Sequence, residues 1–170
     1  VVAAFGMAYA LAAVAAPGVA PQVTPLDWTP GIGSAQPSLT TTREGAFVLS
    51  WQQKQGAEAE LHVARFDARR PGAPFSAASP PSAQASVARG DDWFVNWADF
   101  PSLAVLDNGD WVTFTLRKSA GSTYAYDIHL QRSLDGGATW QPPVKVNDDG
   151  QPVQHGFVSL LPDGGDRVLM

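Results

Sequence analysis

A short segment near the middle of the chain concentrates side chains that suit sugar chemistry. From Gly90 to Phe100 the sequence reads GDDWFVNWADF, which holds three aspartates, one asparagine and two tryptophans. Aromatic rings can stack on the C–H face of a sugar, and carboxylates accept hydrogen bonds from its hydroxyl groups. Paired carboxylates can also supply the acid and the base of glycoside hydrolysis. The candidate sugar-binding residues are Asp91, Asp92, Trp93, Asn96 and Trp97, and Asp99 is a candidate catalytic carboxylate.

The same residues admit a structural interpretation that is equally well supported. Trp93 and Trp97 are compatible with core packing, and the aspartates with the capping of turns. His155 precedes a predicted strand and is a further candidate acid, base or hydrogen-bond donor. No histidine pair has the spacing of metal ligands and the chain has no cysteine, so we expect neither a metal nor a cofactor.

Composition narrows the class of partner. The chain has 170 residues, with 11 basic and 16 acidic side chains and a net charge of −5. Nucleic acids and anionic membrane surfaces both select a basic patch, so we expect neither as a partner. The 16 glycines, 14 prolines and six tryptophans favour short strands joined by many turns.

The N-terminal stretch differs sharply from the rest of the chain. Residues 1–20, VVAAFGMAYALAAVAAPGVA, are almost wholly apolar and rich in alanine. This run resembles the hydrophobic part of a secretory signal followed by small residues, and it is short for a membrane span. A buried helix or a membrane anchor is the competing interpretation. We therefore predict a signal-peptide remnant over 1–20, a linker over 21–36, and a periplasmic or secreted protein with no membrane span in the mature chain.

From residue 37 onward the chain contains a weak internal repeat. Pro37-Ser38-Leu39 recurs as Pro101-Ser102-Leu103, and Phe157-Val158-Ser159-Leu160 matches Phe100-Pro101-Ser102-Leu103. Each copy continues into a glycine-containing turn between apolar runs, which is the pattern of a β-hairpin. Strand repeats of roughly this length are typical of β-propeller blades. The copies predict blades near 37–90, 98–150 and 155–170.

The predicted strands follow one another within each copy. In the second copy they cover 102–106, 111–116, 128–132 and 144–146, and in the first 39–42, 47–52 and 61–66, with a poorly defined fourth strand. Helical periodicity is absent after residue 20. We expect an all-β fold of four-stranded antiparallel blades, about two and a half of them, with the remaining blades of a propeller supplied by a longer chain.

One turn of the second copy carries a specific motif. After its third predicted strand come residues 133–140, SLDGGATW. Asp135 can accept backbone N–H bonds across its own turn, Gly136 and Gly137 can adopt positive φ, and Trp140 can fold beneath the turn. The stretch fits Ser-x-Asp-x-Gly-x-Thr-Trp, the Asp-box, at Ser133, Asp135, Gly137, Thr139 and Trp140. It resembles the bacterial neuraminidase repeat of the sialidase superfamily.

This resemblance implies a six-bladed type of β-propeller for residues 37–170. In that superfamily the Asp-box lies on the outer rim, between the third and fourth strands of a blade. The catalytic pocket is remote from it, at the mouth of the central channel where the innermost strands begin. Asp135 is therefore expected to be a structural residue and not a catalytic acid.

The sequence departs from the superfamily at its substrate clamp. Sialidases carry Arg-Ile-Pro where this chain has Asp99-Phe100-Pro101. The arginine binds the sialate carboxylate, which an aspartate would repel. The nearest match to the general acid of the superfamily lies around Tyr124 and Asp127, and either Arg117 or Lys118 stands near its second basic position. If the protein is catalytic, its candidate residues at the channel mouth are Asp99, Tyr124, Asp127 and His155, with Arg117 as a candidate substrate-binding residue.

Two functions follow, and a third interpretation is a degenerate product without activity. The first is an exported sialidase-like propeller that hydrolyses glycans at the channel mouth, on a substrate that need not be a sialic acid. The second is a non-catalytic propeller of the cell envelope that binds carbohydrate or protein.

Overall fold

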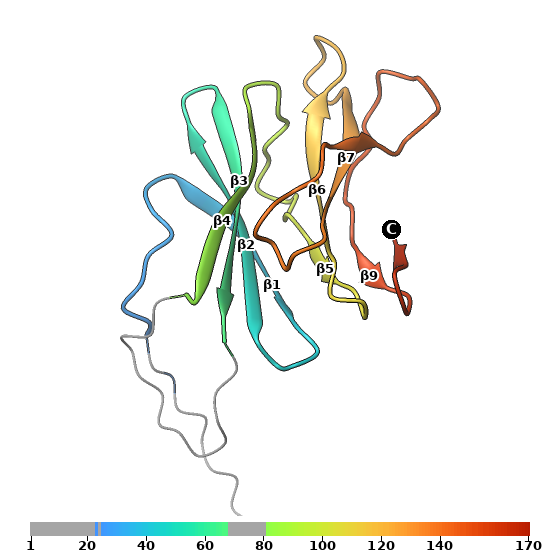
Figure 1. Cartoon of the computed structure of the whole chain (residues 1–170). Coiled ribbons are helices and arrows are strands. Elements are labelled where there is room, and N and C mark those ends of the chain that lie inside the picture. The colour runs from blue at the N-terminus through green and yellow to red at the C-terminus, as the bar shows by residue number, and fades with distance from the viewer. Residues whose placement is uncertain (1–22, 24, 68–80) are drawn as a thin grey trace, which may run out of the picture.

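The structure is a computed structural model that describes residue 23 and residues 25–67 and 81–170. The signal remnant expected over 1–20 and residues 21, 22 and 24 of the expected linker lie outside the described residues. Within them the chain is all-β, and its ten strands form two four-stranded antiparallel sheets and a short hairpin (Figure 1). The all-β prediction is confirmed, as is the prediction of four-stranded antiparallel sheets.

The first sheet contains β1 (Ser34–Thr41), β2 (Phe47–Gln55), β3 (Glu58–Phe66) and β4 (Ala83–Gly90), in the order β1-β2-β3-β4. β1 begins earlier than predicted, since Ser34 and Ala35 pair with β2 ahead of a bulge at 36–37. β4 is the fourth strand that the sequence pattern left undefined. Its residues are mostly small and lack a clear alternation, but they pair with β3 along almost its whole length.

The second sheet contains β5 (Leu103–Val105), β6 (Trp111–Lys118), β7 (Tyr126–Ser133) and β8 (Val144–Lys145), again in sequence order. All four lie at the positions predicted from the repeat. The turn between β5 and β6 closes through the bond from Gly109 N to Leu106 O, at 3.0 Å. Gly109 takes φ 91°, a conformation that glycine adopts without strain.

The third copy is a hairpin of β9 (Leu161–Pro162) and β10 (Val168–Leu169). The start of the strand expected directly after His155-Gly156 is wrong, because residues 157–160 have no partner strand in the described chain and β9 begins at Leu161. Their backbone N–H groups bond instead to side chains near the start of the second sheet. Phe157 N donates to Asp99 Oδ1 at 3.3 Å, and Leu160 N donates to Ser102 Oγ at 3.3 Å.

Two hydrophobic clusters hold the two sheets and the C-terminal segment together. One lies between the two sheets and joins Leu61 and Val63 of β3 to Leu103 of β5 and Trp111 of β6. The other covers the opposite face of the second sheet, where Leu160 packs with residues of β6 and β7. A buried hydrogen bond from Ser50 Oγ to Pro101 O, at 2.6 Å, also joins the sheets. The second sheet is thus buried on both faces.

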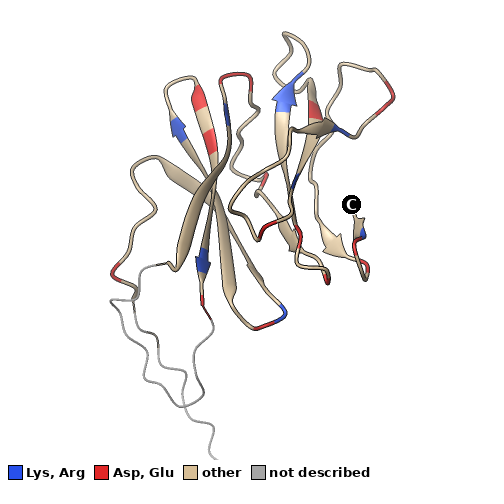
Figure 2. Ribbon diagram, in the orientation of Figure 1, with Lys and Arg blue, Asp and Glu red and all other residues tan. Residues whose placement is uncertain are grey.

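Charged residues are spread over turns and strand ends, and no basic face gathers in the described part of the chain (Figure 2). No helix of the described residues is long and apolar enough to cross a bilayer.

Candidate functional site

A pocket of about 320 Å³ lies beside the middle of β1 and the residues that lead into β5. It lies between three stretches that are distant in sequence: β1, the turn before β5, and the segment before β9. The internal repeat explains this convergence, because the three serines of the repeat, Ser38, Ser102 and Ser159, all line the pocket. Its other lining residues are Ala98, Asp99, Phe100, Phe157 and Val158.

Asp99 is the carboxylate of this pocket, and it is held in place on both oxygens. Its side chain is almost fully buried, with a residue exposure of 5%. Oδ2 accepts a hydrogen bond from Asn96 Nδ2 at 2.8 Å, and Oδ1 accepts one from Phe157 N at 3.3 Å. A carboxylate offers about four acceptor positions. Asp99 therefore keeps capacity for a ligand hydroxyl while its orientation is fixed.

Asn96 positions Asp99. Its Oδ1 accepts the N–H of Ala98 at 3.1 Å, and its backbone carbonyl accepts the N–H of Asp99 at 3.3 Å. The asparagine closes a local turn in this way and directs its amide N–H at the carboxylate. Of the residues predicted to bind sugar, Asn96 is the one that the structure joins directly to Asp99.

Exposed aromatic rings surround Asp99. Phe100 and Phe157 line the pocket and have exposures of 51% and 68%. Trp97, in the same turn as Asn96, is 83% exposed, so the core-packing interpretation is wrong for it. Exposed apolar rings that gather beside a fixed polar group are typical of a binding surface.

Trp93, in contrast to Trp97, is a core residue. It is only 6% exposed and belongs to the cluster between the two sheets. Residues 92–94 run beside the end of β6, where Lys118 N donates to Asp92 O at 2.7 Å and Phe94 N donates to Leu116 O at 2.9 Å. Trp93 forms a backbone bridge with Arg117. Trp93 therefore lies where the core-packing interpretation expects it.

Asp91, Asp92 and Arg117 lie away from the pocket. The two aspartates are exposed in the turn that follows β4, and none of the three residues lines the cavity around Asp99. Arg117 is half-buried near the end of β6 and pairs in register with Asp127 of β7. Asp91 and Asp92 are thus close to Asp99 in the sequence but do not line its pocket.

Asp127 and His155 lie together, but in a separate network. Asp127 pairs with Lys145 at 2.8 Å, accepts a hydrogen bond from Asn147 Nδ2 at 2.8 Å, and lies 3.7 Å from His155. The hydrogen bonds from Lys145 and Asn147 lower the pKa of the Asp127 carboxyl. A carboxyl held ionised in this manner is not a general acid at neutral pH, so the acid role implied for Asp127 is not supported.

His155 and Tyr124 also lack contact with the pocket. His155 Nδ1 lies 2.9 Å from Tyr126 O, and Nε2 lies 3.0 Å from Asp149 Oδ1. The Asp149 carboxylate and the Tyr126 carbonyl raise the pKa of His155. Tyr124 is largely exposed, and its ring centroid is 5.9 Å from that of Phe94. Neither residue lines the cavity at Asp99.

The Asp-box forms the turn between β7 and β8 that its sequence predicts. Asp135 Oδ1 accepts the N–H of Thr139 at 2.8 Å and Oδ2 accepts its hydroxyl at 2.6 Å. These bonds and one from Ser133 lower the pKa of Asp135 to about 2. Gly136 and Gly137 take φ 67° and 89°, and Trp140 Nε1 donates to Gly137 O at 3.2 Å. The acceptor capacity of Asp135 is thus directed into its own turn.

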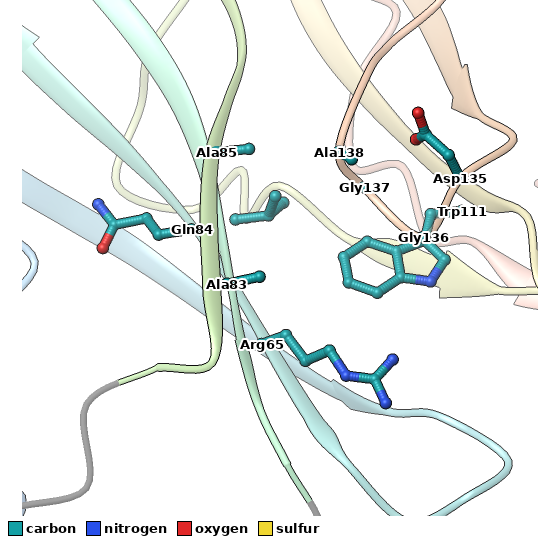
Figure 3. Close-up of a pocket in the computed structure, with 10 residues that line it drawn as sticks. Arg65, Ala83, Gln84, Ala85, Trp111, Asp135, Gly136, Gly137 and Ala138 are labelled. Atoms are coloured by element: carbon teal, nitrogen blue, oxygen red, sulfur yellow. The ribbon is translucent and has the colours of Figure 1, made fainter.

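A second pocket, of about 370 Å³, lies between this turn and the first sheet (Figure 3). Arg65 and Trp111 line it, while the Asp135 carboxylate turns away from Arg65 in the view of Figure 3. Arg65 pairs with Asp67 at 2.9 Å. A Cβ on Gly137 would come within 2.5 Å of Trp111, so the turn already sits against the indole ring. This pocket is best explained as the place where the turn packs against the first sheet.

No family model matches the chain, and no curated protein is similar to it at a significant level. Among the described residues, no three histidine or acidic side chains converge in the manner of a metal site. Function therefore has to be argued from the pocket at Asp99.

The sequence interpretation missed Phe100, Phe157 and the three serines as site residues. A signal for them was present, because all five belong to the aligned copies of the repeat. Aligned positions at the start of the first strands converge in space, and that convergence is what assembles the pocket.

Proposed function

We propose that this chain contributes blades to a sialidase-like β-propeller and binds a neutral glycan at the pocket around Asp99. The observation that carries the proposal is the composition of this pocket. Three serines from equivalent positions of the repeat surround a buried, oriented carboxylate, and exposed rings lie at its edge. Hydroxyl and carboxylate groups suit sugar hydroxyls, and the rings suit the C–H face of a sugar.

Sheet topology supports the propeller component of the proposal. Each four-stranded sheet has its strands in sequence order, and the sheets pack face to face through a shared core. The first strands lie side by side, with β5 in contact with both β1 and β9. The Asp-box occupies the turn between the third and fourth strands. Propeller blades have this strand order and pack face to face.

The charge of the pocket favours a neutral ligand. Asp99 is the charged side chain among the described residues that line it. A sialate or another acidic sugar would place its carboxylate against this aspartate without a cation to neutralise either group. A neutral hexose unit instead offers hydroxyl donors to Asp99 and acceptors to the serines.

Binding without hydrolysis is the role that the geometry supports best. Glycoside hydrolysis generally needs two carboxyl groups on either side of the scissile bond, about 5–9.5 Å apart. Asp99 is the carboxylate that lines the pocket, and Asp127 is committed to its ion pair with Lys145. The described residues therefore supply one of the two groups.

The test is a binding measurement with neutral oligosaccharides, by glycan array and then by titration calorimetry. We expect binding by the wild-type protein and a loss of about tenfold or more in Phe100→Ala and Asp99→Asn. Leu134→Ala is the matched control, because Leu134 is an exposed apolar residue in the remote Asp-box turn. A folded protein that binds no neutral glycan would overturn the proposal. Hydrolysis of a fluorogenic sialoside that is lost in Asp99→Asn would replace it with the catalytic alternative.

A further inference from the structure

Phe157 has an unusual backbone conformation for its residue type. Its φ is 61°, in the left-handed region that bulky residues rarely enter. Gln36, with φ 50°, is the other non-glycine residue with positive φ in the described chain. Gln36 precedes Pro37-Ser38-Leu39 and Phe157 precedes Val158-Ser159-Leu160, so both stand at the same position of the repeat. Gln36 lies in the bulge of β1, whereas Phe157 lines the pocket at Asp99. Strained backbone at a pocket is a pointer to function.

The segment that contains Phe157 is fixed at three consecutive residues. His155 contacts Tyr126 O and Asp149 through its two ring nitrogens. Gly156 lies directly against the Tyr126 hydroxyl, with no room for a Cβ. Phe157 donates its own N–H to Asp99, whose other oxygen is held by Asn96. The left-handed conformation is therefore imposed by neighbours on both sides.

The Phe157 ring does not pack in the core. Phe157 is 68% exposed, whereas Leu160, three residues later, is buried in the core of the second sheet. A phenylalanine in a strained conformation with most of its ring in water stabilises the fold poorly. Phe157 nevertheless lines the pocket, as does Phe100 from the preceding repeat.

We infer that Phe157 is a ligand-contacting residue of this pocket and that Asp99 is the positioning residue that holds it. The ligand chemistry is the C–H face of a hexose unit, stacked on the Phe157 ring while Asp99 accepts a hydroxyl. This inference rests on the proposed function and assigns the specificity-determining ring within it. Asp99 thus has two tasks, since one carboxylate both fixes the ring and meets the sugar.

The decisive variant is Phe157→Gly, because glycine accepts positive φ without strain and removes the ring. We expect its melting temperature to equal or exceed that of the wild type, while its affinity for a neutral oligosaccharide falls at least about tenfold. Phe157→Tyr keeps the ring and should retain the affinity. Phe47→Ala is the control, since Phe47 is a partly exposed ring on β2 that does not line the pocket.

A second measurement tests the positioning role of Asp99 without a ligand. The backbone chemical shifts of residue 157 report its left-handed conformation, and we expect Asp99→Ala to move them toward the values of ordinary extended backbone. Unchanged shifts would overturn the positioning role. If the wild type binds a glycan and Phe157→Gly binds it equally well, the inference about the ring is wrong and the proposed function stands. If the wild type binds no glycan, the proposed function itself fails.

Discussion

Three aspartates illustrate how surroundings divide one side-chain type among different roles. Asp135 is committed to the hydroxyl and amide of Thr139, and Asp127 is committed to Lys145 and Asn147. Asp99 is oriented by Asn96 and Phe157 N, yet it alone of the three lines the pocket at the first strands. The neighbours of each carboxylate, and not its place in the sequence, decide whether it is available to a ligand.

We expect Asp135→Ala to lower stability and to leave glycan affinity unchanged. The variant removes acceptors for the N–H and O–H of Thr139 and for Ser133 Oγ, which hold the turn closed. Because the folded pKa, about 2, is below the usual aspartate value, the stabilisation is present above about pH 3.9 and lost as pH falls through about 2. Thermal melts at pH 7 and pH 2 check this. A changed affinity at an unchanged melting temperature would contradict the structural assignment.

Gly137 and Gly136 form a matched pair for testing the same turn. Alanine at either position has an unfavourable positive φ, which costs on the order of 1 kcal/mol. At Gly137 the new Cβ would also come within 2.5 Å of Trp111, whereas nothing lies within 4 Å at Gly136. We expect Gly137→Ala to reduce the free energy of unfolding by about 1–3 kcal/mol more than Gly136→Ala does, as measured by urea denaturation. Equal losses would mean that the turn does not pack on the indole ring.

At the scale of elements, the sequence predicted the strands correctly where backbone hydrogen bonds between neighbouring strands form the structure. The strands of the second sheet were predicted because apolar runs alternate with turns such as Asp107-Asn108-Gly109. The strand expected after Gly156 begins only at Leu161, because side chains of Asp99 and Ser102 replace a partner strand over residues 157–160. A pattern of residue types does not reveal such long-range bonds.

The candidate site was predictable to a similar extent. Asp99 and Asn96 were predicted because their types and spacing suit sugar recognition, and the structure joins them by a hydrogen bond at one pocket. Asp127 and His155 lie in a network separate from the pocket, and the sequence does not show this because the ion pair of Asp127 with Lys145 depends on strand register. Trp93 and Trp97, four residues apart, have opposite exposures that only the turn between them decides. The left-handed conformation of Phe157 has no signature in its residue type.

His155 fastens the segment before β9 to β7, and we expect this contact to depend on pH. The two ring nitrogens of His155 face two acceptors, Tyr126 O and Asp149, so the protonated ring can donate a hydrogen bond to each. Asp127, which is paired with Lys145, also lies near the ring. Because these groups raise the folded pKa above the usual histidine value, the stabilisation is fully present below about pH 6.5 and lost as pH rises through the folded pKa.

The check is a series of thermal melts from pH 5 to pH 9. The difference in melting temperature between the wild type and His155→Gln should be largest at low pH and shrink as pH rises. Asp149→Asn is the control, since it removes the anion that raises the histidine pKa and should shift the decline to lower pH. A difference that is constant across the range would show that the ring charge does not contribute.

At the scale of the whole molecule, the second sheet is the centre of the described structure. One of its faces packs on the first sheet through Trp111 and Leu103, and the other packs on the segment around Leu160. The pocket at Asp99 lies at the junction of all three parts, and the hydrogen bond from Ser50 to Pro101 O crosses beside it. The geometry of the site therefore depends on how the sheets stack, and not on either sheet alone.

Leu61→Ala tests whether the sheets unfold as one unit. Leu61 is fully buried on β3 and shares its cluster with Leu103 and Trp111 of the other sheet. We expect a loss of about 2–5 kcal/mol in the free energy of unfolding. Hydrogen-exchange protection of β6 and β7 should fall in step with that of β2 and β3, because removal of a shared core destabilises both sheets. Leu39→Ala, at an exposed site on β1, should change the free energy by no more than about 0.5 kcal/mol. Loss of protection confined to the first sheet would instead make the sheets independent, and the pocket at their junction would then vary in shape with their relative motion.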